Sequence, residues 1–167
     1  MNITDINGKV KLNNGYEMPY LGLGVYKSKD GDEVKDAIQF ALKAGYRHID
    51  TASFYKNEEG VGEAIKESHI PREELFVTSK VWNDDQGYEG TLKAIDESLA
   101  KLQMDYLDLY LIHWPVPDTL TDTWRAMEEI YRSGKAKAIG LCNCVEHQMD
   151  DVIENGTIKP MLLQNEF

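Results

Sequence analysis

Residues 45–62 read GYRHIDTASFYKNEEGVG, and this stretch indicates the fold. Gly45 can end the helix before it, because glycine adopts the left-handed backbone that closes many helices. Residues 48–52 have the short apolar run of a buried strand, and residues 58–68 have helical spacing with Asn57 as the expected N-cap. A strand, a loop and a helix in this order form the repeating unit of a parallel sheet.

The same unit recurs along most of the chain. Because helices join the apolar runs, the strands should be connected by right-handed crossovers and lie parallel. This alternation is typical of a (β/α)8 TIM barrel, which needs about 250 residues. With 167 residues, we expect one α/β domain over 1–167, an incomplete barrel with about six parallel strands. The predicted strands are residues 21–26, 48–52, 75–81, 107–114, 135–144 and 161–167, and the predicted helices are 32–44, 58–68, 88–102, 121–133 and 146–155.

Residues 9–18, KVKLNNGYEM, predict a β-hairpin ahead of the first parallel strand. Asn14 and Gly15 accept the positive backbone angles of a tight turn. In an incomplete barrel the first and last strands each keep one unpaired edge. We therefore expect either a second copy of the chain or a rearrangement to cover these edges. Coverage by a second copy would make the protein a homo-oligomer.

The composition is that of a soluble globular protein, with 42% hydrophobic residues and a net charge of −11. This acidity argues against nucleic acids and anionic membranes as partners, because both are bound through Lys and Arg. The sequence shows neither a targeting segment nor an apolar run of roughly 18 residues. We therefore expect a cytoplasmic protein.

Two cysteines, Cys142 and Cys144, lie two positions apart in the predicted strand 135–144. Side chains at i and i+2 share a face of a strand with their alpha carbons about 6.6 Å apart, so a disulfide between them would be strained. His147 follows them, yet no second ligand cluster has the spacing of a zinc site. We expect two buried thiols and no metal.

Four polar residues stand at or just beyond the carboxyl ends of predicted strands: Asp50, Tyr55, Lys80 and His113. Active residues of parallel α/β folds gather at this end, where the loops meet at one mouth. The set suits reduction of a carbonyl, in which a hydride reaches carbon and a proton reaches oxygen. Tyr55 would supply the proton, with its pKa lowered from about 10 by the Lys80 ammonium that Asp50 holds. His113 would orient the carbonyl oxygen.

Each of these residues also has a structural interpretation. A lysine at a strand end is usually solvated, a tyrosine in a loop can lie on the surface, and an aspartate can cap a loop. A histidine before Trp114 and Pro115 can be a satisfied core residue. For each residue taken singly the structural interpretation is favoured, and the placement of all four at one rim strengthens the catalytic one without identifying the reaction.

Residues 45–62 closely resemble the signature of the aldo-keto reductase family. Further segments resemble that family in the same order and spacing: VTSKVWN (77–83), LDLYLIHWP (107–115), GKAKAIGLCN (134–143) and IKPMLLQNEF (158–167). The resemblance covers nearly the whole chain and implies a (β/α)8 barrel with an amino-terminal hairpin across its bottom. It also implies an NADPH-dependent reductase of small-molecule aldehydes and ketones, with NADH as the alternative cofactor.

By position, the resemblance gives the four rim residues the catalytic roles described above, with Tyr55 as the proton donor. The resemblance also places Trp82 and Trp114 in the substrate pocket. From the residues alone, both would be interpreted as core or rim aromatics. Asn143 and Gln164 match positions that hydrogen-bond the nicotinamide carboxamide. The residues that would bind the cofactor are Val25, Tyr26, Asp50, Asn143 and Gln164.

Three positions depart from the family pattern. Cys142 stands where serine is common, Cys144 where an aromatic is usual, and Leu163 where asparagine is expected. Each change trims packing or a polar contact near the cofactor, which costs about 1–3 kcal/mol where a buried partner is left unsatisfied. In the family, the aromatic that stacks on the nicotinamide and the basic residues for the adenosine phosphate come from later strands. The LGLG at 21–24 lacks the spacing of a dinucleotide fingerprint.

Two hypotheses for the function follow. The first is an abbreviated reductase that a second chain completes or that works with a weakened cofactor site. The second is a noncatalytic half-barrel that lacks a competent cofactor site and associates through its open sheet edges. A third class, an isomerase or metal hydrolase on a TIM barrel, lacks a carboxylate and histidine cluster with metal spacing.

Overall fold

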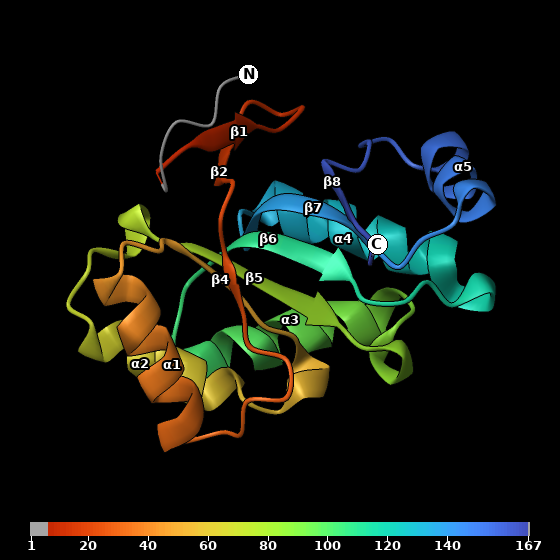
Figure 1. The fold of residues 1–167 in the computed structure, drawn as a ribbon. Helices are drawn as coiled ribbons and strands as arrows, with labels where there is room; N and C mark the ends of the chain where they lie inside the picture. Colours follow the sequence, from red (N-terminus) through yellow and green to blue (C-terminus); the bar gives the residue numbers. More distant parts are fainter. Residues whose placement is uncertain (1–6, 167) are drawn as a thin grey trace.

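A parallel sheet of six strands forms the centre of the computed structural model, which describes residues 7–166. Each strand pairs with the next one along the chain. The sheet curls into a half-barrel (Figure 1), so the predicted fold class is confirmed. In order, the strands are β3 (Leu23–Gly24), β4 (His48–Asp50), β5 (Phe76–Val81), β6 (Leu107–Ile112), β7 (Ala136–Cys142) and β8 (Leu162–Gln164).

Helices alternate with these strands and lie along the outer face of the sheet (Figure 1). No helix in the described part of the chain combines the length and the apolar composition that a membrane crossing needs. Short 3₁₀ turns at Ser53–Tyr55, Asn83–Asp85 and Pro117–Thr119 stand in the loops that follow three of the strands. The helices are α1 (Asp32–Lys43), α2 (Glu58–Glu67), α3 (Tyr88–Leu102), α4 (Leu120–Ser133) and α5 (Glu146–Asn155).

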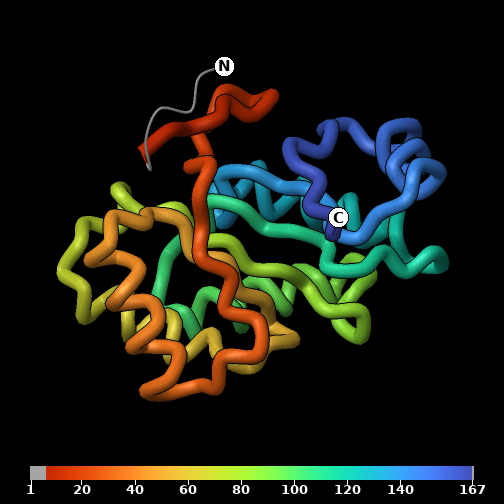
Figure 2. The backbone as a smooth tube through the Cα atoms, viewed as in Figure 1, coloured from red at the N-terminus to blue at the C-terminus, as the bar shows by residue number. Residues whose placement is uncertain are grey.

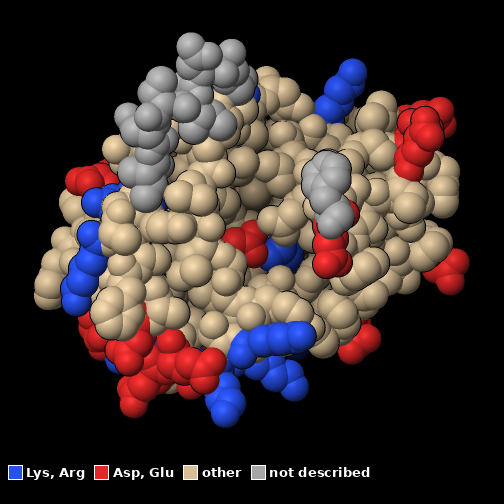
Figure 3. Space-filling model, in the orientation of Figure 1, with Lys and Arg blue, Asp and Glu red and all other residues tan. Residues whose placement is uncertain are grey.

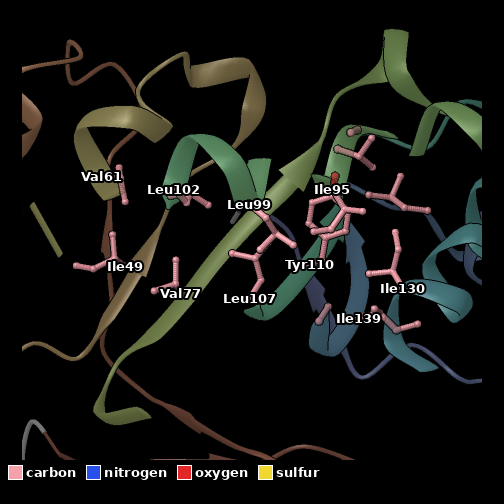
Figure 4. Close-up of a cluster of buried hydrophobic side chains, with 14 of the residues drawn as sticks. Ile49, Val61, Val77, Ile95, Leu99, Leu102, Leu107, Tyr110, Ile130 and Ile139 are labelled. Atoms are coloured by element: carbon pink, nitrogen blue, oxygen red, sulfur yellow. The ribbon is translucent and has the colours of Figure 1, made fainter. Parts of the chain in front are cut away.

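Apolar side chains are buried on both faces of the sheet. The layer between the sheet and the helices contains Ile49, Val77, Tyr110 and Ile139 (Figure 4). Because successive side chains of a strand point to opposite faces, a strand covered on both sides is buried throughout. β5 and β6 are buried at every position, including the polar Thr78, Ser79 and Lys80 of β5. The smaller cluster on the concave face contains Leu12, Phe76, Leu109, Leu111, Ala138 and Cys142.

The amino-terminal hairpin consists of β1 (Lys9–Lys11) and β2 (Glu17–Pro19), which pair antiparallel as predicted. Gly15 has φ +86°, as the turn requires. Asn14 was expected to share that conformation, but among residues 7–166 it is not one of those with positive φ. Its side-chain oxygen instead accepts a hydrogen bond from the Tyr16 amide at 3.0 Å, so Asn14 stabilises the turn through its side chain.

Two side chains tie this hairpin to the other end of the chain. Asn13 Nδ2 donates to the carbonyl oxygen of Pro160 at 2.8 Å, and Asn14 Nδ2 donates to that of Lys137 at 3.0 Å. Figure 2 shows the hairpin at the same end of the molecule as the segment that leads into β8. The hairpin therefore lies at the end of the sheet where β7 begins, opposite the carboxyl ends of the strands.

The carboxyl-terminal strands are shorter than predicted. β7 ends at Cys142 because Asn143, with φ +53°, turns the chain. The expectation that Cys142 and Cys144 share a strand face is therefore wrong, since the first packs in the concave cluster and the second under the helices. Both are buried free thiols. β8 ends at Gln164, and Phe167, predicted to continue it, lies outside the described residues.

Gly140 allows β8 to lie close to β7. A methyl group there would stand 2.2 Å from the Leu162 carbonyl oxygen and 3.0 Å from Leu111 Cδ2. A backbone atom cannot yield by changing rotamer, so we expect Gly140→Ala to lower the free energy of unfolding in urea by about 1–3 kcal/mol. Gly24→Ala is the control, because nothing lies within 4 Å of its added methyl group. Equal stability of the two variants would contradict this assignment.

Candidate active site

Lys80 is the centre of a polar cluster at the carboxyl ends of the strands. It lies near the end of β5, is 1% exposed, and forms an ion pair with Asp50, the last residue of β4. Its Nζ also donates to the Thr51 carbonyl oxygen at 3.0 Å and to Tyr55 Oη at 3.4 Å. Two predicted residues of the segment 45–62, Asp50 and Tyr55, therefore meet the ammonium group of the predicted Lys80.

Tyr55 reaches this cluster from the 3₁₀ turn that follows β4. The turn is anchored to β5, because Ser53 Oγ donates to the Lys80 carbonyl oxygen at 3.0 Å. Burial raises the pKa of Tyr55, and the Lys80 charge, 5.1 Å from the ring centre, offsets only part of that increase. Lys80 does lower the pKa of Tyr55, as expected. The predicted net decrease of this pKa is nevertheless wrong, because burial raises it by more.

His113 follows β6 and closes the cluster on its other side. Its ring meets the ring of Tyr55 edge-on, with centroids 5.6 Å apart at 77°, and that of Trp82 at 5.2 Å and 77°. Burial and the nearby Lys80 charge lower the pKa of His113 to about 4, so the imidazole is neutral at neutral pH. Its buried Nδ1 has no hydrogen-bond partner among residues 7–166.

The titration of His113 is directly measurable. We expect its imidazole resonances to move with a midpoint near pH 4, because burial disfavours the charged ring. The unfolded chain, with a pKa near 6.5, takes up the proton first, so the stability that His113 contributes is complete above pH 6.5 and is lost as the pH falls towards 4. A His113→Gln spectrum assigns the resonances, and a midpoint at or above 6.5 would contradict the burial argument.

Of the four predicted rim residues, Tyr55 and His113 line a pocket of about 430 Å³, whereas Asp50 and Lys80 are not among its lining residues. Figure 3 shows a hollow in this view of the molecule with acidic and basic atoms inside it, while most other charged atoms lie near the periphery. The predicted Trp82 and Trp114 both belong to the pocket wall, which aromatic and amide side chains dominate. The lining residues are Tyr26, Phe54, Tyr55, Trp82, His113, Trp114, Cys142, Asn143, Gln164, Asn165 and Glu166.

Phe54 is a wall residue that the sequence did not single out. Its ring stacks on that of Trp82 with centroids 3.8 Å apart and planes at 20°, and it meets His113 edge-on at 6.2 Å. The available signal was a second aromatic directly before Tyr55 in the rim loop. Successive residues of a turn point in different directions, so only the folded loop shows that both aromatics border the pocket.

Residues at the ends of strands β7 and β8 form the opposite wall of the pocket. Three residues predicted to lie near the cofactor meet there: Cys142, Asn143 and Gln164. Gln164 Nε2 donates to Asp50 Oδ2 at 3.0 Å, and its Oε1 accepts from the Cys142 thiol at 3.4 Å. Asn143 Nδ2 donates to the His113 carbonyl oxygen at 3.0 Å. Burial raises the pKa of Cys142 to about 11, so the thiol stays protonated and serves as the donor to Gln164.

Not every predicted residue reaches the pocket. Val25 is 1% exposed and packs in the layer under the helices, whereas its neighbour Tyr26 is largely exposed and lies with its ring 5.0 Å from that of Tyr55. Cys144 is also part of the helix-side layer, and Leu163 is an exposed residue of β8. The departures at Cys144 and Leu163 therefore leave the lining of the pocket unchanged.

Glu58 is a buried acid behind the rim, also unforeseen from the sequence. It is 2% exposed at the start of α2, and its Oε1 accepts a hydrogen bond from Ser79 Oγ at 2.6 Å. Burial raises the pKa of this carboxyl group. Acidic residues in the first turn of a helix ordinarily face solvent, where they interact with the helix dipole, so composition alone did not distinguish Glu58 from the neighbouring Glu59.

A family model described as the aldo/keto reductase family matches residues 18–167. The chain belongs to this family. It is 57% identical over 164 residues to the glyoxal reductase of Bacillus subtilis, covering 98% of this chain and 59% of that protein. The solved structure of an aldo/keto reductase from Brucella melitensis superposes with a TM-score of 0.93 at 51% identity, covering 96% of this chain and 63% of the other.

A third comparison involves a structure with a nucleotide bound. An aldo-keto reductase of Bombyx mori in complex with NADP has a TM-score of 0.90 at 37% identity, with 98% of this chain and 59% of that one covered. The chain thus spans about 60% of the length of these aldo-keto reductases. Its six strands correspond to part of the barrel of such relatives.

The chemistry of the pocket wall suits the nicotinamide end of a dinucleotide. A carboxamide needs both a hydrogen-bond donor and an acceptor, and the side-chain amides of Asn143 and Gln164 offer both beside the Cys142 thiol. The buried and unpartnered Nδ1 of His113 adds polar capacity at the same pocket. Besides His113 and Cys142, the described lining residues are aromatic, amide or acidic, and none of them is Lys or Arg. The pocket therefore matches the uncharged nicotinamide end of the cofactor.

Proposed function

We propose that this chain carries the proton-transfer half of an NADPH-dependent reductase of small aldehydes and ketones. The observation that carries the proposal is the contact of Lys80 with both Asp50 and Tyr55, where Tyr55 and a neutral His113 line the same pocket. Membership of the aldo/keto reductase family supports this reaction class. The Bacillus subtilis relative, a glyoxal reductase, points to small carbonyl compounds as the first substrates to test.

In the proposed reaction the chain binds the carbonyl group between Tyr55 and His113. A ring N–H of neutral His113 donates to the carbonyl oxygen and holds it towards the Tyr55 hydroxyl. When NADPH is bound, it supplies the hydride that the carbonyl carbon receives. The electron pair of the C=O bond then takes the Tyr55 proton, and the Lys80 ammonium stabilises the phenolate that forms. The raised pKa of Tyr55 keeps its proton in place until the oxygen becomes basic.

The remaining pocket residues would hold the reactants. Asn143 and Gln164, with the Cys142 thiol between them, would bind the carboxamide of the nicotinamide. Trp82 and Phe54 would present one aromatic face to the substrate. Trp114, which is 49% exposed, would form the outer edge of the substrate pocket.

Steady-state turnover tests this function. The purified chain is mixed with NADPH and either glyoxal or methylglyoxal, and loss of the reduced nicotinamide absorbance is followed; a parallel series uses NADH. We expect saturable turnover with NADPH, and the NADH series measures the preference between the two cofactors. Absence of turnover with both carbonyl compounds at saturating cofactor would overturn the proposal.

The open sheet edges of β3 and β8 favour a second candidate, a noncatalytic half-barrel that associates through them. Native mass spectrometry with and without NADPH separates the two candidates. Retention of one cofactor per chain supports the reductase. A dimer that retains no cofactor supports the binding role instead.

A further inference from the structure

Asn57 is a completely buried amide whose hydrogen bonds leave its own helix. It occupies the predicted N-cap position of α2, but its side chain makes no capping bond to that helix. Its Oδ1 accepts from Thr51 Oγ1 at 2.7 Å. Its Nδ2 donates to the carbonyl oxygens of Val25 and Ser28, each at 3.0 Å. All the hydrogen atoms of the amide are therefore used outside the helix.

These bonds join two loops that carry aromatic residues of the pocket. The carbonyl groups of Val25 and Ser28 flank Tyr26 in the loop between β3 and α1, and Thr51 begins the loop that carries Tyr55. The ring centroids of Tyr26 and Tyr55 lie 5.0 Å apart. Since the Tyr26 side chain is 57% exposed, packing alone does not fix it.

A second tie holds the far end of the same loop. Asp30 Oδ1 accepts a hydrogen bond from the Gly60 amide at 2.8 Å. Lys27, between the two carbonyl groups that Asn57 binds, has φ +67°, a conformation that non-glycine residues adopt only when their surroundings hold them. The Val25 amide also donates to the Asp50 carbonyl oxygen at 3.0 Å, which fixes the start of the loop. Asn57 is the side chain that holds the loop on both sides of Tyr26 and the strained Lys27.

We propose that Asn57 is a positioning residue that holds the Tyr26 loop against the Tyr55 loop and so sets the mouth of the pocket. Only an amide offers one acceptor and two donors in a single plane at this size. An aspartate would keep the acceptor for Thr51 but would turn a carboxylate oxygen towards the carbonyl oxygens of Val25 and Ser28. The catalytic consequence rests on the proposed reductase function, whereas the ordering of the loop does not.

Hydrogen exchange followed by mass spectrometry on the full chain tests the proposal without any activity. We expect Asn57→Asp to accelerate exchange in the segment 25–31 by about tenfold, the effect of losing one to two buried hydrogen bonds, while amides of β6 exchange as before. Asn57→Ala is the second variant, because it removes the same donors without adding charge. Thr51→Val is the matched control, since it removes the bond to Asn57 Oδ1 and leaves both bonds to the Tyr26 loop in place.

The outcomes separate a positioning role from a merely structural one. Faster exchange confined to 25–31 in both Asn57 variants, with Thr51→Val close to the unchanged chain, supports the proposal. Equal acceleration of 25–31 and β6, or no change in 25–31, overturns it. Asn155→Asp, which alters a surface amide that donates to the Asp151 carbonyl oxygen at 2.8 Å, controls for the added charge.

Turnover then adds a separate readout. If the chain reduces methylglyoxal, Asn57→Asp should lower kcat/KM more than Thr51→Val does. If exchange in 25–31 responds as expected while the unchanged chain shows no turnover, the positioning role stands and the proposed reductase function fails. The two conclusions are therefore tested independently.

Discussion

Tyr55→Phe is expected to lower kcat for NADPH-dependent carbonyl reduction by about 10²–10⁴-fold, the range contributed by a positioned general acid. The hydroxyl at 3.4 Å from Lys80 Nζ is the acid placed beside the neutral His113, and phenylalanine keeps the ring contacts with Tyr26 and His113. Substrate and cofactor binding should change little. Steady-state kinetics and a cofactor-binding titration on the same preparation measure the two effects.

Tyr131→Phe is the matched control for that substitution. Tyr131 lies on α4, packs against the core outside the pocket, and its loss of a hydroxyl group should leave turnover unchanged. Circular dichroism of both variants establishes that they fold alike. Retention of more than about a tenth of the original kcat by Tyr55→Phe would reject Tyr55 as the proton donor, because general acid catalysis contributes about 10²-fold or more.

Lys80→Met is expected to lower the free energy of unfolding by about 3–5 kcal/mol at neutral pH, besides abolishing turnover. Its ammonium is 1% exposed and paired with Asp50, whose side chain is 13% exposed. Removing one member of such a pair leaves the other charge without its partner in a largely dry site. Urea unfolding followed by tryptophan fluorescence measures the loss.

A double-mutant cycle distinguishes this pairing from simple loss of packing. Asp50→Asn combined with Lys80→Met should cost less than the sum of the two single substitutions, because no uncompensated charge then remains. Additive costs would show that the two side chains stabilise the fold independently. Since Gln164 Nε2 also donates to Asp50, the asparagine variant retains an acceptor for that bond.

Much of the framework followed from local patterns in the sequence. The run that became β6 is apolar except for Asp108 and is buried at every position, so its composition carried a strong signal, and the helix predicted at 88–102 was found with the same bounds. The rim cluster was also accessible, because a parallel sheet brings the carboxyl ends of all its strands to one side. Lys80, Asp50 and Tyr55 meet there for that reason.

The remaining features depend on tertiary contacts that a sequence pattern does not carry. Asn57 has the residue type and position of an N-cap, yet three partners from two other segments compete successfully for its side chain. The pKa of Tyr55 depends on a balance between burial and one nearby charge, and the sequence gives the charge but not the burial. Tertiary contacts likewise place Phe54 in the pocket wall and bury Glu58 in the interior, and neither position was evident from the sequence.

The asparagine ties of the hairpin have a consequence for the order of folding. Asn13 and Asn14 bond to carbonyl groups 147 and 123 positions further along the chain. Contacts between such distant residues carry a large loop-closure entropy and form late. The two asparagine bonds can therefore form only once β7 and the segment that leads into β8 are in place, whereas Tyr16, whose hydroxyl donates to Asp108 Oδ1 at 2.6 Å, can dock the hairpin on β6 before that. The asparagine ties thus mark the completion of the half-barrel.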